Sequence, residues 1–198
     1  MDQSKMYVLF IKGHGLIANG ILLYEKLWNI TSKYTHVGLV VHKGLLDKKI
    51  SDLFCLTNDF YILESTLSGV LNDSVNSSCD KTIFGPQFRS FDDFVSVYSK
   101  FGDVKAKLVE MDQSLSLNLC NYLGKRYDYN VLNLTMIHVP YIYYKNDKYF
   151  CSDLITSLLK DNGMVDKNIN SKKVSPNKLY KLLKKNKLTS KEITLCLN

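Results

Sequence analysis

The sequence predicts an α+β fold, in which helices lie around a small antiparallel β-sheet. Two patterns support this class. Short runs of apolar and β-branched residues, typical of strands, occur at 7–11, 35–42, 60–64 and 106–111. Segments with apolar residues at helical spacing occur at 16–28, 91–98, 114–123, 152–160 and 176–185.

Turn signals separate the predicted strands. The run 7–11 is followed by glycines at 13 and 15, which indicate a turn before the first helix. The strand 35–42 ends at Lys43-Gly44, and the strand 60–64 is entered from a Thr-Asn-Asp segment. These two strands can therefore pair as neighbours around the loop between them.

Several predicted helices have recognisable ends. Ser90 can cap the helix 91–98, with Asp92 and Asp93 in its first turn. Gly124 ends the helix 114–123. Pro176 opens the helix 176–185. Residues 71–82 are rich in Ser, Asn and Asp and are expected to form a surface loop.

The length and charge distribution indicate one domain with a basic end. The 198 residues, with 45% hydrophobic and 23% charged side chains, suit a single folded domain over 1–198. The net charge of +7 comes entirely from a lysine-rich C-terminal region, 160–198, which we expect to be helical. Only two basic residues of the chain are arginines, which argues against specific nucleic-acid recognition. The basic region could instead contact an anionic membrane surface.

Cysteine usage and the N-terminus predict a cytoplasmic protein. The five cysteines are widely spaced and form no Cys-x-x-Cys pair, so neither a metal site nor a disulfide framework is expected. No signal-peptide pattern and no membrane-spanning apolar run is visible. The composition, rich in Lys, Asn and Tyr, fits a large DNA virus or an intracellular bacterium; a viral protein would act in the host cytoplasm or the virion.

Three residues in separate predicted elements could form a nucleophilic site. Cys151 directly precedes the helix 152–160, where free backbone N–H groups and the helix dipole favour a thiolate. His36 lies near the start of one predicted strand, and Glu64 lies at the end of the next. The imidazole could take the thiol proton while the carboxylate orients the ring. Each residue alone also has a structural explanation: a buried thiol, a core histidine and a strand-end acid.

Short motifs surround these residues: His36-Val37-Gly38, Glu64, Gly124-Lys125-Arg126-Tyr127-Asp128, Phe150-Cys151-Ser152-Asp153 and Ser175-Pro176. Together they resemble the permuted branch of the papain-like NlpC/p60 superfamily, over most of the chain. This branch includes YiiX-like bacterial proteins, poxviral members and, more distantly, the lecithin:retinol acyltransferase group. Two positions depart from the family pattern: Thr35 stands where Ser is common, and Asp153 where Glu is common.

The resemblance implies a permuted papain-like fold and a thiol hydrolase of the amidase, peptidase or acyl hydrolase type. It implies Cys151 as nucleophile, His36 as base and Glu64 as the group that orients the histidine. The backbone N–H of Cys151 would be one oxyanion donor. No cofactor is expected, and the substrate would be a small molecule, a lipid or a peptide. Further candidates for substrate contacts are Tyr127, His14 and Tyr149.

Two other functions remain open alongside the hydrolase. The same three residues could transfer an acyl group to a lipid acceptor, because both reactions share the acyl-enzyme. Alternatively, the domain could be a binding or virulence module whose chemistry is idle. The uncharged stretch 129–144, which carries four tyrosines, could wall an apolar groove for an acyl chain or form part of the core.

Overall fold

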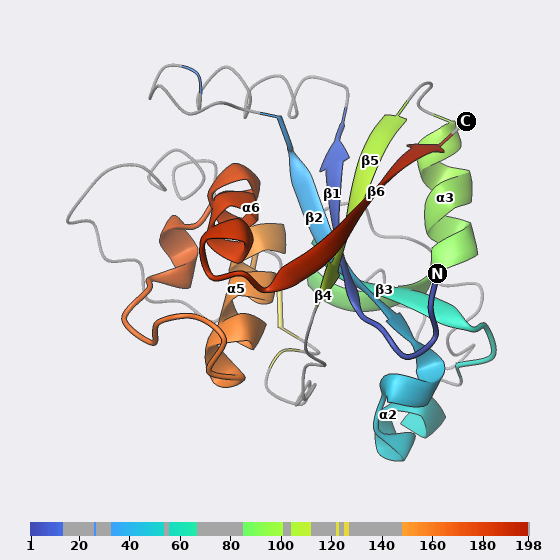
Figure 1. Ribbon diagram of the computed structural model, residues 1–198. Helices are drawn as coiled ribbons and strands as arrows, with labels where there is room; N and C mark the ends of the chain where they lie inside the picture. Colours follow the sequence, from blue (N-terminus) through green and yellow to red (C-terminus); the bar gives the residue numbers. More distant parts are fainter. Residues whose placement is uncertain are drawn as a thin grey trace.

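A six-stranded sheet forms the centre of the computed structural model (Figure 1). The structure describes residues 1–13, 26, 33–53, 56–66, 85–100, 104–111, 122, 125–126 and 148–197. The strands are β1 (Tyr7–Lys12), β2 (His36–His42), β3 (Phe60–Thr66), β4 (Gly85–Ser90), β5 (Val104–Met111) and β6 (Thr189–Leu197). Neighbouring strands are antiparallel throughout, in the order β4-β3-β2-β1-β5-β6. The predicted α+β class and the predicted pairing of the second and third strands are therefore confirmed.

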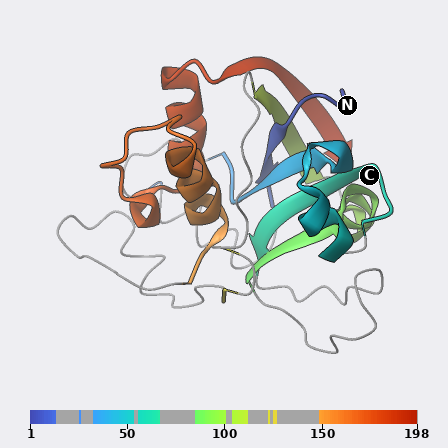
Figure 2. The same cartoon turned by 90° about the horizontal axis from the view of Figure 1, so that it is seen from below.

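Helices cover both faces of this sheet. Helix α5 (Cys151–Asp161) packs on β2 and β3, and α6 (Pro176–Lys185) packs beside α5. Helix α3 (Phe91–Ser99) lies against the opposite face, as Figures 1 and 2 both show. The short helix α2 (Lys48–Leu53) follows β2. The sheet is thus the middle layer between α5–α6 and α3, with a hydrophobic core on each side.

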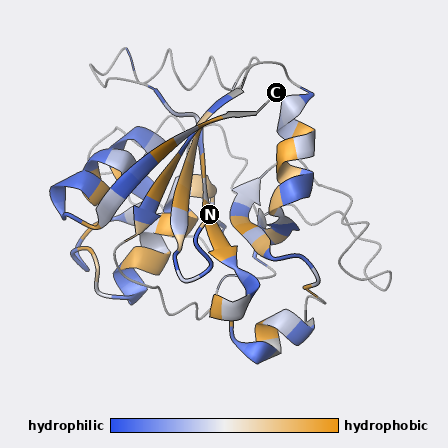
Figure 3. Ribbon diagram, turned by 45° about the vertical axis from the view of Figure 1, so that its right-hand side comes forward, coloured by the Kyte–Doolittle hydropathy of each residue, from blue (hydrophilic) through white to orange (hydrophobic). Residues whose placement is uncertain are grey.

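The alternation of side chains along β2 determines which residues face which layer. Val37, Leu39 and Val41 belong to the core under α5 and α6, so His36 and Val40 point to the α3 side. Hydrophobic residues are frequent along the strands (Figure 3), and those of α5, α6 and α3 belong to the two cores. Gly38 allows close packing on the α3 side, because a Cβ there would lie 2.6 Å from Cδ1 of Ile62. Glu64 shares this face with Ile62, two residues away on β3.

The two edge strands, β4 and β6, differ from the sequence-based expectation. β4 contains Pro86 directly after Gly85, two residues that do not indicate a strand. Proline is tolerated here because, among the described strands, β4 pairs with β3 alone. The expected helical character of 160–198 holds for α6 but is wrong for Thr189–Leu197, which form β6. In β6, Ile193 and Leu195 alternate with polar residues and pack on the α3-side core. The predicted helices 16–28 and 114–123, the loop 71–82 and the stretch 129–144 lie outside the described residues.

Lysines of the basic C-terminal region take part in internal ion pairs. The Nζ atom of Lys172 lies 2.8 Å from Oδ2 of Asp153, and that of Lys184 lies 2.8 Å from Oε1 of Glu192. Acidic side chains of the protein therefore neutralise part of the positive charge of 160–198. None of the described helices is long and apolar enough to cross a lipid bilayer.

Asn177, at the start of α6, fixes the chain that enters β2. Its Oδ1 accepts hydrogen bonds from the backbone N–H groups of Lys33 and Tyr34, at 2.8 and 3.0 Å. Its Nδ2 donates to the carbonyl of Tyr34 at 2.9 Å. Asn177 is 3% exposed, so water does not replace these bonds easily. The amide therefore sets the position of the chain two residues before His36.

Replacing Asn177 with alanine is expected to lower the free energy of unfolding by about 3 kcal/mol, because three backbone groups lose their partner in a buried place. Urea denaturation measures the change. Asn168→Ala is the matched control, since Asn168 is exposed and should change stability by less than about 0.5 kcal/mol. Equal effects of the two substitutions would contradict the anchoring role of Asn177.

Candidate functional site

Cys151 is the first residue of α5 and is 7% exposed. Phe150 before it has extended backbone angles, so the chain changes from extended to helical at the cysteine. The first backbone N–H groups of a helix have no partner within it, and the helix dipole places partial positive charge there. The sulfur therefore occupies the place in α5 where negative charge is stabilised best.

Neighbouring segments hold the start of α5 in position. The hydroxyl of Ser65 donates to the carbonyl of Tyr149 at 2.6 Å, and that of Ser152 donates to the carbonyl of Val174 at 2.6 Å. Lys172, 13% exposed, forms its ion pair with Asp153 and also donates to the carbonyl of Lys148. These contacts fix residues on both sides of Cys151.

His36 and Glu64 form a hydrogen-bonded pair on adjacent strands. Nε2 of His36 lies 2.7 Å from Oε2 of Glu64, and the Glu64 side chain is fully buried. The imidazole is 15% exposed at the first position of β2. Since Nε2 is occupied by the carboxylate, Nδ1 is the ring nitrogen left for Cys151 or a substrate.

The position of Glu64 differs from the sequence-based expectation. β3 continues through Ser65 to Thr66, so the acid lies inside the strand instead of at its end. Ser65 and Thr66 continue the strand because they pair with Pro86 and Gly85 of the edge strand β4. Glu64 is thereby enclosed between Gly38 and Gln87 in the register of the sheet. Ser65 points to the opposite face and reaches the segment before Cys151.

Arg89, which the sequence analysis did not select, is the second partner of Glu64. Its Nη2 lies 2.8 Å from Oε1 of the carboxylate, and the side chain is 2% exposed. The guanidinium also lies over the ring of Phe94, 5.8 Å from its centroid. Each oxygen of Glu64 thus faces one basic group, His36 on one side and Arg89 on the other. The sequence offers one weak signal for this role, which is that Arg89 is one of only two arginines in the chain.

Tyr98 of α3 stacks on the ring of His36. The ring centroids of Tyr98 and His36 are 6.4 Å apart with an interplanar angle of 23°. Phe94, one helical turn earlier, contacts Tyr98 at a centroid distance of 4.5 Å. Aromatic residues four positions apart on a helix lie on one face, which is the signal that could have indicated this contact. The α3 layer therefore restrains the rotation of the imidazole.

The electrostatics of the site favour a charged histidine beside a charged glutamate. Burial of the His36 ring favours its neutral form, but Tyr98, Cys151 and Glu64 outweigh burial and raise the pKa of His36 well above its ordinary value. Burial likewise opposes the charged form of Glu64, but His36 and Arg89 prevail and lower the pKa of its carboxyl. Cys151, the first residue of α5, is one of the groups that raise the pKa of His36.

The raised pKa of His36 predicts that the free energy of unfolding falls as pH increases above about 6.5. A group with a higher pKa in the folded state stabilises the protein fully below its unfolded pKa. That contribution is lost as the pH rises through the folded pKa, with a slope of up to about 1.4 kcal/mol per pH unit. Urea denaturation across this range measures the slope. His36→Gln should remove it and His42→Gln should keep it; a slope unchanged in the His36 variant would exclude His36 as its source.

The other predicted site residues are not all brought together. Tyr149, half-buried, packs edge-on against Tyr122 at a centroid distance of 5.3 Å, with the Nζ atom of Lys172 4.8 Å from the centre of its ring. His14 and Tyr127 lie outside the described residues. The carbonyl of Arg126 accepts a hydrogen bond from the N–H of Tyr149, so the chain just before Tyr127 runs beside the Cys151 segment. Within the described part of the chain, no cluster of three or more His, Cys, Asp or Glu side chains could hold a metal ion.

Comparisons with protein-family models, curated proteins and solved structures give no match to this chain. The site offers a thiol at a helix start, an imidazole with one free nitrogen, and a buried carboxylate held by a guanidinium. This arrangement can move one proton between sulfur and nitrogen while keeping the ring in a fixed orientation.

Proposed function

We propose that the protein is a cysteine hydrolase that cleaves an amide, ester or thioester through an acyl-enzyme, on a fold of the permuted papain-like NlpC/p60 type. The observation that carries the proposal is the 2.7 Å contact between Oε2 of Glu64 and Nε2 of His36. Cys151, at the first position of α5, contributes to the raised pKa of the same imidazole. Cys151 is the nucleophile, His36 the acid and base, and Glu64 the orienting group.

In the first half of the reaction, Nδ1 of His36 holds the proton that the Cys151 thiol releases. The sulfur attacks the carbonyl carbon, and the carbonyl π electrons move to oxygen. The backbone N–H of Cys151, at the start of α5, can donate to this oxyanion. The oxyanion then collapses, the bond to the leaving group breaks, and the proton on His36 passes to that group.

In the second half, a water molecule attacks the thioester carbonyl and gives a proton to Nδ1 of His36. The carbon–sulfur bond breaks, the acid leaves, and the proton returns to the sulfur of Cys151. Glu64 keeps the same tautomer and ring orientation through both halves, because its bond to Nε2 is not used for proton transfer. An amine, alcohol or thiol in place of water would give acyl transfer by the same route.

The charged groups around Glu64 support a catalytic role of the site over a purely structural one. The buried pair of Glu64 and Arg89 would be neutral by itself. Glu64 nevertheless also binds His36, whose second ring nitrogen is left for the thiol or a substrate. Perturbed pKa values that cluster around one thiol are typical of functional sites. The restraint of His36 by Tyr98 adds a fixed orientation, which a nucleophile–base pair needs.

Incubation with 4-nitrophenyl acyl esters is expected to leave an acyl group on Cys151, detected by intact mass and peptide mapping. Product analysis with and without a lipid amine or alcohol then distinguishes hydrolysis from transfer. The matched control is Cys196→Ser, which removes a different thiol and should leave acylation intact. Slow acylation spread evenly over all five cysteines would instead support an idle binding module.

A further inference from the structure

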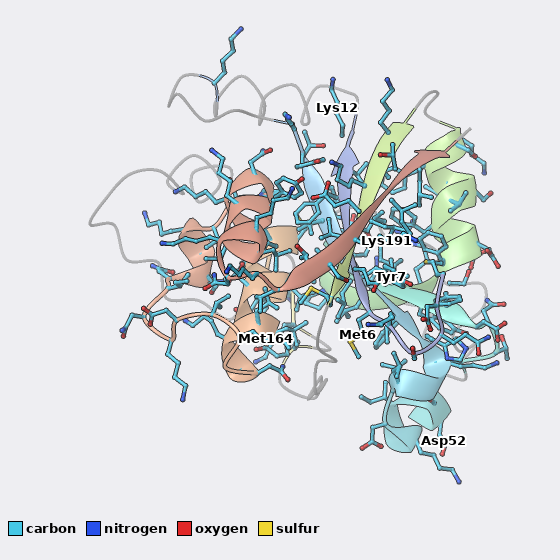
Figure 4. The ribbon with its side chains drawn as sticks, in the orientation of Figure 1. Met6, Tyr7, Lys12, Asp52, Met164 and Lys191 are labelled. Carbon is cyan, nitrogen blue, oxygen red and sulfur yellow. The ribbon has the colours of Figure 1, made fainter. Side chains whose placement is uncertain are left out.

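A basic pocket lies at the end of the sheet where β1 finishes and β5 begins. It has a volume of about 320 Å³. Lys12 of β1, which Figure 4 labels, lines it together with Lys105 and Lys107 of β5. The remaining polar wall is formed by Lys33, Tyr34 and Thr194. We call these six residues the lysine pocket.

Few acidic side chains in the described part of the chain compensate the positive charges of the lysine pocket. Lys12 and Lys105 are direct cross-strand partners, an arrangement in which like charges destabilise a sheet. Glu192 is the carboxylate that ion-pairs here, and it is shared between Lys107 and Lys184 at 2.8 Å each. Among the described residues, Lys12, Lys33 and Lys105 form no ion pair. The ion pairs of the described residues therefore do not account for Lys12, Lys33 and Lys105.

The polar wall of the pocket is held firmly. The backbone of Lys33 and Tyr34 is fixed by the three hydrogen bonds to Asn177. Tyr34 packs against Phe10 and Tyr180 at centroid distances of 5.2 Å each. Lys107 is fixed by Glu192 and lies over the ring of Tyr180. Tyr34 and Lys107 thus line the pocket from positions that do not have to be ordered on binding.

We propose that the lysine pocket binds a phosphate group carried by a small molecule or a lipid headgroup. Lysine ammonium groups bind phosphate as point charges, and several of them around one concavity satisfy its charge and its oxygens. A phosphate between Lys12 and Lys105 also removes the repulsion of the cross-strand pair. The pocket volume lies at the lower end of the range for small-ligand sites, enough for a phosphate and a short polar attachment. This inference does not depend on Cys151 and stands or falls separately from the proposed hydrolase.

Binding is measured by calorimetry with inorganic pyrophosphate and by sedimentation with phosphatidylcholine vesicles, with and without phosphatidic acid. The K12A/K105A variant is expected to bind about tenfold more weakly than the wild type. The matched control K48A/K167A removes the same net charge from exposed lysines outside the pocket and should bind like the wild type. Pyrophosphate binding identifies a soluble ligand, and vesicle binding alone identifies a lipid headgroup.

Thermal unfolding provides the second readout and controls for folding. Without ligand, K12A/K105A should unfold at the same temperature as the wild type or higher, because a repulsive pair has been removed. With pyrophosphate, the wild type should gain more thermal stability than this variant. Equal weakening in the two double variants would show nonspecific attraction and overturn the proposal, as would the absence of binding to either probe.

Discussion

Replacing Cys151 with serine is expected to lower kcat/KM for an activated ester by at least about a thousandfold, while the fold stays intact. The substitution exchanges sulfur for oxygen at the first position of α5, in a site that is 7% exposed. A hydroxyl gives up its proton far less readily than a thiol, so the attacking anion becomes rare. The loss is read from steady-state kinetics, with circular dichroism as the check on folding.

The losses of activity caused by substituting Cys151 and His36 should not be additive. His36→Ala alone is expected to cost about as much as Cys151→Ser, and the double variant should cost little more than either single variant. Groups that work as one unit show this behaviour, whereas independent groups multiply their effects. Multiplying losses, or full activity of Cys151→Ser on every substrate that is cleaved, would contradict the proposed mechanism.

Local sequence patterns were sufficient for the elements that carry the site. Apolar runs predicted β1, β2, β3 and β5, and helical spacing predicted α3, α5 and α6, with a capping serine for α3 and an opening proline for α6. The expectation that His36 and Glu64 lie on adjacent strands is confirmed by the register that pairs β2 with β3. The period of apolar residues and the residues that mark the ends of helices and strands are properties of short segments, so they can be read from a single sequence.

Contacts between distant segments were not predictable in the same way. Glu64 and Arg89 meet because the edge strand β4 pairs with β3. Pro86 lies within β4, so the local sequence does not indicate a strand there. Asn177 and Tyr34 are more than one hundred residues apart in the chain. Lys172 belongs to the lysine-rich region 160–198, yet its ammonium group pairs with Asp153 of α5. Such polar contacts depend on tertiary packing, which composition and spacing do not encode directly.

Replacing Arg89 with methionine is expected to lower the free energy of unfolding by about 3 to 5 kcal/mol. Methionine keeps much of the apolar contact with Phe94 but leaves Glu64 fully buried with His36 as its remaining partner. A buried carboxylate that loses one cation carries its desolvation penalty largely uncompensated. Arg126→Met is the matched control, because it replaces the other arginine of the chain at an exposed position and should change stability by less than about 0.5 kcal/mol.

A double-mutant cycle separates this charge effect from lost packing. If Arg89 acts by compensating Glu64, then Glu64→Leu combined with Arg89→Met should be more stable than Arg89→Met alone, since the orphaned charge is gone. In the Arg89 single variant the pKa of Glu64 should rise, because His36 alone then opposes its burial; carboxyl NMR measures this shift. A lower pKa of Glu64, or a double variant less stable than Arg89→Met, would mean that Arg89 supports the core without positioning the acid. The expected outcome instead makes Arg89, together with His36, a group that keeps Glu64 charged, and the charged Glu64 in turn orients the imidazole of His36.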